Sequence, residues 1–473
     1  MEYMRSRFAG YGWDLVQYKR VRSVYALTKD GVPALYIKIY HPDSPFQKLR
    51  NLLRPKTLRE LRLLMRLREA GVPVPEPVSH LRHGTVSALV TKAVHPCTSL
   101  LGLPEERQAD ILLTMASGLL RKGFYYKDCH AGNVILDGSG NPFLVDAYAV
   151  VPVGRVRRGH VVSLMSQVTT ACRVPDEKLR THLAGLLPLN ELDVAVRTIQ
   201  RRGLVTRGRL ARRRAERTLR EGSFSRHVRT DDYEAFVSKT HPVPLDEVLR
   251  VHAENLAQGR NILKYQEKTQ LSRVGDLCVK SYAKPKPFTS PYALRSWKGL
   301  MTLYYNNIPV ADPVAVVLRK DGTSVLVTKM VPERDLNRVM FHEYPSMTPA
   351  DRRELARSLG RLLGLMHGYG IYHADLKSSN IKVIRDPVSF VLLDTDRVRQ
   401  GRCLSREKRI RNMAQINNSI PRHVSRGVRM AFLKAYAEVV RDDARTLFRE
   451  VWALSSKGSI VYRTDQGDRF ESW

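Results

Sequence analysis

The stretches YYKDCHAGNVIL (residues 125–136) and IYHADLKSSNIKV (residues 371–383) carry the same pattern in the two halves of this 473-residue chain. In each stretch an Asp is followed five positions later by an Asn that opens a run of aliphatic residues. The two aspartates, Asp128 and Asp375, lie 247 positions apart, and so do the two asparagines. A spacing kept this strictly indicates that the chain contains a repeat.

Further stretches match in the same order on either side of these loops. The pairs are LYIKIY (35–40) with LCVKSY (277–282), GVPVPEPV (71–78) with NIPVADPV (307–314), VTK (90–92) with VTK (327–329), and FLVDAY (143–148) with VLLDTD (391–396). A repeat of this length predicts two copies of a globular domain and not a short-period solenoid. We place the two copies at residues 1–228 and 229–473.

The order of predicted elements within a copy is strands, one helix, more strands and then a mostly helical region. Segments such as VYALTKD and ALYIKIY are rich in β-branched and aromatic residues and predict strands. Helical periodicity predicts helices at residues 57–71, 108–123 and 352–370, each ending in Gly. We therefore expect an α+β fold of two tandem domains, each with a small β-rich lobe and a larger helical lobe.

Composition narrows the class of protein. The chain is 43% hydrophobic and 26% charged, which is typical of globular proteins. No apolar run is long enough to span a membrane, and the first residues lack the apolar segment of a secretory signal. Five scattered cysteines predict no disulfide framework, which favours the cytoplasm. The formal net charge of +33, spread over both halves, predicts an anionic partner.

The first copy contains the residue types that phosphoryl transfer requires. This chemistry needs a cation on the nucleotide phosphates, oxygen ligands for Mg²⁺, and a carboxylate that receives the proton of the acceptor hydroxyl. Lys38 lies in a predicted strand, and Asp128 and Asn133 have the spacing of the D-x-x-x-x-N catalytic loop. Asp146 follows a short apolar strand, which can hold a carboxylate at the edge of a cleft. These residues predict ATP and Mg²⁺ as cofactors, with Asp128 as the catalytic carboxylate.

The second copy repeats this set with Lys280, Asp375, Asn380 and Asp394. In kinase-like folds an acidic residue on the first helix pairs with the strand lysine. Glu60, 22 positions after Lys38, suits this role in the first copy.

Two departures from conventional protein kinases are visible. In the second copy the position aligned with Glu60 is Ser296, and the surrounding helix has no acidic residue. Neither copy has a G-x-G-x-x-G loop: KRVRSVYAL and QEKTQLSRVGDL stand there instead. If one copy is inactive, we expect it to be the second, because no acidic residue on the helix around Ser296 is placed to hold Lys280.

The motifs resemble those of the lipopolysaccharide core kinases, the heptose and Kdo kinases of Gram-negative bacteria. In the second copy the resemblance is carried by HADLKSSNIKV, VLLDTDRVR and RNMAQINNSIPRHVSRGVRMAFLKAYAE. In the first copy it is carried by LYIKIYHP, GVPVPEPV and YKDCHAGNVIL, although Tyr126 replaces the usual His. The resemblance implies a protein-kinase-like fold and ATP-dependent phosphorylation of a sugar hydroxyl of an inner-core lipid saccharide. It also implies peripheral contact with the cytoplasmic face of the inner membrane, while the tandem arrangement departs from single-domain members.

Alternatives remain open for both the activity and the basic surface. The chain could be a protein Ser/Thr kinase-like enzyme, or a pseudokinase scaffold with one inactive copy. Residues 201–220 contain nine Arg and one Glu. They form either a solvated helical face or a surface that binds anionic lipid or substrate phosphates. We expect no nucleic-acid partner, because aromatic residues do not interleave with the basic ones.

Overall fold

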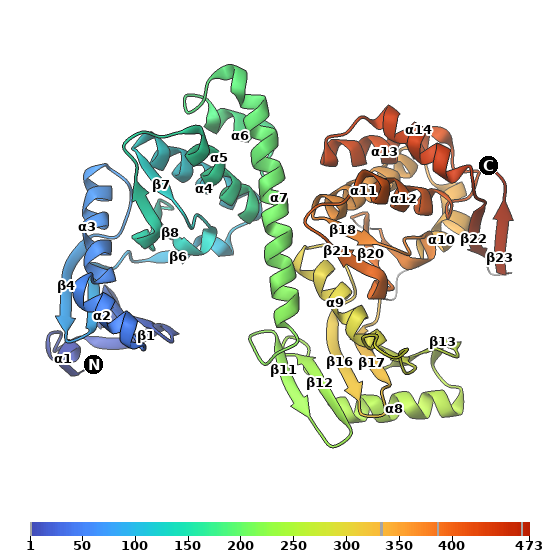
Figure 1. Cartoon of the computed structure of the whole chain (residues 1–473), viewed down its shortest axis with the longest axis horizontal. Helices are drawn as coiled ribbons and strands as arrows, with labels where there is room; N and C mark the ends of the chain where they lie inside the picture. Colours follow the sequence, from blue (N-terminus) through green and yellow to red (C-terminus); the bar gives the residue numbers. More distant parts are fainter. Residues whose placement is uncertain (1, 332–333, 386, 465–466) are drawn as a thin grey trace. The chain divides into compact units, whose positions relative to one another are not determined.

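The computed structural model describes residues 2–331, 334–385, 387–464 and 467–473. The chain forms two compact units, unit 1 (Met1–Leu204) and unit 2 (Val205–Trp473), and the division falls inside helix α7 (Leu192–Arg217). The division after residue 228 that the repeat suggests lies beyond this helix and stays a prediction. Each unit is therefore described by itself (Figure 1).

The small lobe of unit 1 is a five-stranded antiparallel sheet with the strand order β1-β2-β3-β5-β4. Its strands are β1 (Gly12–Lys19), β2 (Arg22–Lys29), β3 (Val32–Tyr40), β4 (Pro77–His83) and β5 (Val86–Lys92). Helices α1 (Glu2–Ser6), α2 (Pro45–Leu53) and α3 (Lys56–Glu69) accompany the sheet. The helix predicted over residues 57–71 is thus observed as α3.

A tight turn sets the register of the strand that carries Lys38. Asp30 and Gly31 join β2 to β3 with φ angles of 53° and 78°. Two positive φ angles in a two-residue loop are typical of a type I′ hairpin, for which Asp-Gly is a preferred pair. The resulting register places Lys38 opposite Val24 on one side and Leu89 on the other, in the middle of the sheet.

The larger lobe of unit 1 is mostly helical and has one continuous hydrophobic core. It contains the helices α4 (Glu105–Arg121), α5 (Arg158–Ala171), α6 (Asp176–Leu183) and the first part of α7. Short strands carry its loops: β6 (Cys97–Ser99), β7 (Phe124–Tyr126), β8 (Val134–Asp137), β9 (Pro142–Leu144) and β10 (Val150–Pro152). Helix α4 begins three residues before the predicted start, because Glu105 and Glu106 in its first turn favour the helix N-terminus.

The small lobe of unit 2 has a seven-stranded sheet with the order β11-β12-β16-β17-β15-β14-β13. Its strands are β11 (Ser225–Arg229), β12 (Tyr233–Ser238), β13 (Ile262–Gln266), β14 (Thr269–Val274), β15 (Leu277–Tyr282), β16 (Pro313–Arg319) and β17 (Ser324–Lys329). Helices α8 (Leu245–Gln258) and α9 (Tyr292–Tyr305) pack on it. The sequence did not indicate α8, which separates β12 from the later strands.

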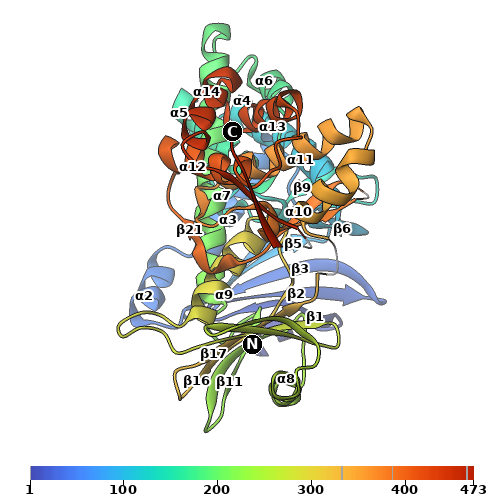
Figure 2. The ribbon, with the colours of Figure 1, turned by 90° about the vertical axis from the view of Figure 1, so that its right-hand side faces the viewer.

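The helical lobe of unit 2 lies at the opposite end of that unit from its sheet (Figure 2). Its helices are α10 (Leu336–Arg338), α11 (Pro349–Gly368), α12 (Arg406–Asn417), α13 (Arg426–Val440) and α14 (Ala444–Ser455). Its short strands are β18 (Ile371–His373), β19 (Ile381–Ile384), β20 (Ser389–Leu392), β21 (Val398–Gln400), β22 (Ile460–Thr464) and β23 (Gly467–Glu471). The mixed helix and strand content of the chain confirms the predicted α+β class.

No helix within the described ranges combines the length and the apolar character needed to cross a bilayer.

A histidine is buried in the helical core of unit 2. His367 on α11 is 4% exposed. Its Nδ1 lies 2.8 Å from the Tyr436 hydroxyl on α13, and its Nε2 lies 3.2 Å from Asn412 Oδ1 on α12. Burial lowers the pKa of His367 to about 3. The neutral ring thus joins three helices through hydrogen bonds.

This buried ring predicts an acid-sensitive unit 2. The unfolded chain binds a proton at His367 below its ordinary pKa of about 6.5, whereas the folded state does so only near pH 3, so stability falls as the pH drops between these values. We expect His367→Gln to remove about 1.4 kcal/mol per pH unit from the slope of unfolding free energy between pH 6 and 4.5. Urea denaturation at successive pH values measures that slope. Equal slopes in both proteins would contradict the prediction.

Candidate functional site

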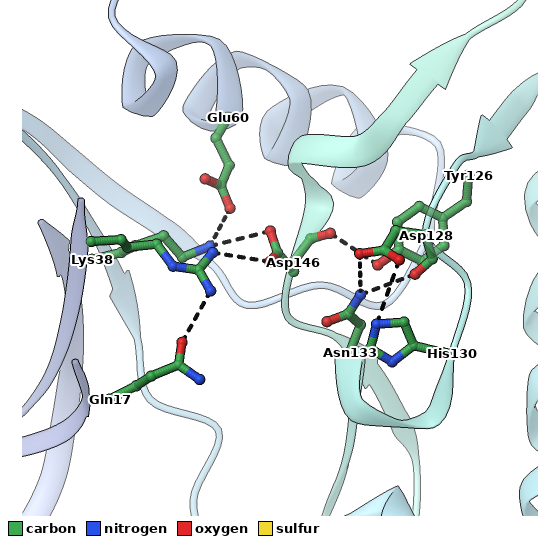
Figure 3. A network of polar contacts seen from close by, with 9 residues as sticks. Gln17, Lys38, Glu60, Tyr126, Asp128, His130, Asn133 and Asp146 are labelled. Atoms are coloured by element: carbon green, nitrogen blue, oxygen red, sulfur yellow. Dashed lines mark hydrogen bonds and ion pairs between the residues drawn. The ribbon is translucent and has the colours of Figure 1, made fainter. Parts of the chain in front are cut away.

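The lysine predicted on β3 is held by two carboxylates in unit 1 (Figure 3). The Nζ atom of Lys38 lies 2.5 Å from Glu60 Oε1 on α3 and 3.6 Å from Asp146 Oδ1 after β9. Glu60 is only 4% exposed, so its charge is compensated by the lysine and not by water. The structure therefore brings together the three residues that the sequence separated by many positions.

An arginine that the sequence analysis did not assign also reaches this cluster. The Arg22 guanidinium at the start of β2 donates to Asp146 Oδ2 at 3.1 Å and to Gln17 Oε1 on β1 at 3.0 Å. Burial pushes the pKa of Asp146 upward, but Lys38 and Arg22 hold it below its ordinary value. Asp146 is thus ionised at neutral pH. The signal in the sequence was KRVRSVYAL, which stands where a glycine-rich loop was sought and contains Arg22.

In the D-x-x-x-x-N loop of unit 1, the side chain of the asparagine forms hydrogen bonds with the aspartate. The Asn133 amide Nδ2 donates to the Asp128 carbonyl at 2.9 Å and to Asp128 Oδ2 at 3.3 Å. Because the amide nitrogen is used in these bonds, the side-chain oxygen of Asn133 is the atom that could bind a cation. The Nε2 atom of His130, which sequence reasoning missed, lies 3.5 Å from Asp128 Oδ1.

The loop is also tied to the backbone of Asp146. The hydroxyl of Tyr126 on β7 donates to the Asp146 carbonyl at 3.1 Å. Burial raises the pKa of Tyr126, so the phenol stays protonated and keeps this bond. This hydrogen bond therefore joins the strand that leads into the Asp128 loop to the backbone of Asp146.

A cleft of about 630 Å³ lies beside this cluster in unit 1. Its lining includes Lys38, Glu60, Asp128, Asn133 and Asp146. A cavity of this volume lies within the usual range of small-molecule sites. All five predicted site residues of the first copy thus face one cavity.

In unit 2 the corresponding lysine and aspartate are in direct contact. The Nζ atom of Lys280 on β15 lies 2.5 Å from Asp394 Oδ1, which follows β20. Burial raises the pKa of Asp394, but Lys280 more than offsets this and leaves the pKa below its ordinary value. Asp394 has a φ of 56°, a left-handed conformation that Asp tolerates better than most residues and that is enriched at functional sites.

The loop of unit 2 repeats the hydrogen bonds of unit 1 closely. Asn380 Nδ2 donates to the Asp375 carbonyl at 2.9 Å and to Asp375 Oδ2 at 3.2 Å. His373 takes the place of Tyr126: burial lowers its pKa, so the neutral ring lies with Nε2 at 3.0 Å from the Leu393 carbonyl. Its Nδ1 accepts the backbone N–H of Asp375 at 3.3 Å.

Helix α9 of unit 2 contains no acidic residue and is held beside Asp394 by close packing. Ser296, the residue aligned with Glu60, shares a 2.8 Å hydrogen bond with the Tyr282 hydroxyl. The Ser296 carbonyl accepts a 2.8 Å bond from Thr395 Oγ1. One turn later, a side chain at Gly299 would overlap the Thr395 carbonyl. The missing ion pair is thus replaced by a helix–loop contact, whose sequence signal was the glycine in SWKGLM.

Two family models match the chain. Residues 249–436 match the lipopolysaccharide kinase (Kdo/WaaP) family. This confirms the resemblance to lipopolysaccharide kinases. The first half differs, because residues 38–155 match the RIO domain, a kinase-like domain. These matches support a kinase-like phosphotransferase, although neither shows its acceptor, and no curated protein matches the chain.

Solved structures of low similarity are also kinases. The kinase domain of PknI from Mycobacterium tuberculosis is 18% identical, with a TM-score of 0.26, covering 35% of this chain and 76% of that one. WbdD is 15% identical, with a TM-score of 0.30, covering 40% of this chain and 45% of that one. The chain thus spans less than half of the WbdD chain. At these scores no argument about site or substrate rests on the likeness.

The close packing of α9 predicts that unit 2 does not tolerate a methyl group at residue 299. We expect Gly299→Ala to lower the free energy of unfolding by about 1–3 kcal/mol, because α9 must move away from the Thr395 carbonyl. Denaturant unfolding followed by fluorescence measures the change.

The matched control is Gly427→Ala on α13. There the nearest atom to an added Cβ, apart from the chain neighbours, is Ser425 Oγ at 3.9 Å. This variant should be stabilised by up to about 1 kcal/mol, because Ala is the better helix former. If the two variants unfolded alike, the packing argument would be wrong.

Proposed function

We propose that the protein is an ATP-dependent kinase that phosphorylates a sugar hydroxyl of a lipopolysaccharide inner-core saccharide. One observation carries the proposal: in each unit a strand lysine contacts an aspartate, and a side chain just before the D-x-x-x-x-N loop bonds the backbone at or next to that aspartate. The acceptor class is supported by the family match over residues 249–436. The repeated cluster also supports two tandem kinase-like domains, divided near residue 228.

In unit 1 the proposed roles follow from charge and position. Lys38, oriented by Glu60, contacts the nucleotide phosphates. Asp128 orients the acceptor hydroxyl and receives its proton, with its carboxylate fixed by the Asn133 amide. A loop aspartate is a weak base, but positioning matters more than basicity when the transition state is loose.

In unit 2 the same roles fall to Lys280 for the phosphates and Asp375 for the hydroxyl. The Asp375 carboxylate forms an ion pair with the Lys377 ammonium at 3.4 Å. The backbone N–H of Asp375 is bonded to His373, so the loop is held in place for the acceptor.

The oxygen atoms in each unit suit Mg²⁺. The proposed ligands are Asn133 with Asp146 in unit 1, and Asn380 with Asp394 in unit 2. Mg²⁺ in phosphate-transfer sites usually takes one or two protein oxygen ligands and completes its shell with phosphates and water. When bound, it would neutralise charge on the phosphate oxygens.

A second candidate function is that unit 2 binds ligands without catalysis. The observation that favours it is the direct 2.5 Å contact between Lys280 and Asp394, on a sheet whose neighbouring helix α9 lacks an acidic residue. Binding phosphates through Lys280 requires this contact to loosen. A protein substrate has no comparable support, because a glycine-rich loop is absent from both copies.

The surface charge supports a place at the cytoplasmic face of the inner membrane. A net charge of +33 attracts anionic glycolipid, and the exposed arginines of residues 201–220 provide a local concentration of that charge. We propose peripheral contact through this charge.

Separate loss of each catalytic aspartate tests the function. With ATP, Mg²⁺ and a dephosphorylated inner-core glycolipid, we expect the wild-type protein to add phosphate, measured by mass spectrometry of the product. Asp128→Asn or Asp375→Asn should reduce the rate at least about a hundredfold at the active copy, because the proton acceptor is lost. The variant that abolishes the rate identifies that copy.

The exposed Asp231 provides the control, since Asp231→Asn makes the same chemical change outside both clusters. It should leave the rate unchanged. If the wild-type protein adds no phosphate to any inner-core saccharide, or if both aspartate variants stay fully active, the proposal fails.

A further inference from the structure

A hollow of about 500 Å³ lies in unit 2 beside the proposed catalytic Asp375. Three parts of the chain line it: the catalytic loop with Asp375 and Lys377, helix α12, and the connection from α14 to β22. Lys280 and Asp394 do not contribute to this lining. The hollow therefore borders Asp375 and is distinct from the lysine–aspartate contact.

Positive charge dominates the side chains that line the hollow. Lys377, Arg411 and Lys457 carry three cations, and Asp375 carries the one carboxylate among the lining residues. Lys377 lies 3.4 Å from Asp375, and Arg411 is paired with the exposed Glu407 at 2.7 Å. Lys457 has no carboxylate partner among the residues that the structure describes. Lys457 is therefore more readily available to a ligand than Arg411, which is paired with Glu407.

Two uncharged polar side chains of the wall, Gln415 and Ser419, already form hydrogen bonds within the protein. Gln415 Nε2 donates to the Ala374 carbonyl at 2.9 Å. Ser419 Oγ accepts the backbone N–H of Ser378 at 2.9 Å. Because these groups hold the wall together, recognition of a ligand falls mainly to the charged side chains.

The wall that carries Lys457 is fixed to α12 by several hydrogen bonds. The Val461 N–H donates to the Asn418 carbonyl at 2.7 Å, and Asn417 Nδ2 donates to Ser455 Oγ at 3.0 Å. The Trp473 indole N–H donates to Asn418 Oδ1 at 3.1 Å. This wall lies beyond residue 436, where the family match ends, so the charge it supplies belongs to this chain's own C-terminal segment.

We propose that this hollow binds the acceptor saccharide through an anionic group, a phosphate or a carboxylate, that Lys457 and Arg411 contact while a neighbouring hydroxyl faces Asp375. The inference rests on the proposed function, because it takes Asp375 as the residue that orients the hydroxyl. It deepens that function by requiring a charged acceptor. In the transfer itself the hydroxyl oxygen bonds to the γ-phosphorus of ATP, ADP leaves, and the hydroxyl proton passes to Asp375.

Binding to the full-length protein tests the proposal without any need for turnover. Isothermal titration calorimetry compares mannose 6-phosphate and glucuronate with uncharged mannose. We expect both anionic sugars to bind at least about tenfold more tightly than mannose, because a charge-assisted hydrogen bond to a cation is among the stronger polar contacts. The affinity should fall as the salt concentration rises.

The variant Lys457→Ala should weaken binding of the anionic sugars about tenfold and leave mannose binding unchanged. The matched control is Lys434→Ala, because Lys434 is an exposed lysine on α13 outside the hollow. It should bind all three sugars like the wild-type protein. Where turnover is measured, Lys457→Ala should raise KM for the acceptor and leave kcat close to wild type.

Three outcomes would overturn the proposal. Mannose could bind as tightly as the charged sugars, Lys457→Ala could leave their affinity unchanged, or inorganic phosphate could bind as tightly as mannose 6-phosphate, which would indicate nonspecific anion binding. Failure of the proposed function looks different: charged sugars would then bind in a Lys457-dependent way, yet none would gain phosphate from ATP.

Discussion

The contact between a strand lysine and a distant aspartate organises each unit. Lys280 and Asp394 are 114 positions apart in the sequence and 2.5 Å apart in space, and Lys38 meets Asp146 in the same way at 3.6 Å. Each contact joins a sheet lobe to a helical lobe. Two part-buried charges are costly to desolvate unless further hydrogen bonds satisfy them, so the surrounding framework has to be accurate. In unit 1 that framework includes Glu60, Arg22 and the Tyr126 hydroxyl.

The two units fix their lysine by different physical means. In unit 1 the carboxylate of Glu60 supplies charge from α3. In unit 2 helix α9 supplies none, and the helix instead approaches the loop so closely that residue 299 must be glycine. The strand before each loop is also held by different side chains. In unit 1 the Tyr126 hydroxyl bonds the Asp146 carbonyl, and in unit 2 the neutral His373 ring bonds the Leu393 carbonyl. The geometry of the cluster is kept while the interactions that hold it differ.

The sequence predicted the clusters well because their residues lie in short motifs with fixed spacing. Lys38, Glu60, Asp128, Asn133 and Asp146 all line one cleft, as the motifs indicated. Their catalytic and metal-binding roles stay predictions. Arg22 and Gly299 were missed, because a single arginine or a single helical glycine has no motif, and its importance depends on what packs against it. Helix α8 was missed for another reason: it is an insertion between strands with no counterpart in the first copy. The two halves also match different family models, a difference that the shared loops did not indicate.

The arginine on β2 gives unit 1 a built-in counter-ion. The Asp146 carboxylate forms ion pairs with two basic side chains, Lys38 and Arg22. If a divalent cation were bound by the Asp146 carboxylate, as proposed for Mg²⁺, Arg22 would be free to contact an anion in the cleft, while Lys38 would keep Glu60 as its partner. The arginine would thus serve as the partner of the carboxylate in one arrangement and as the partner of an anion in the other.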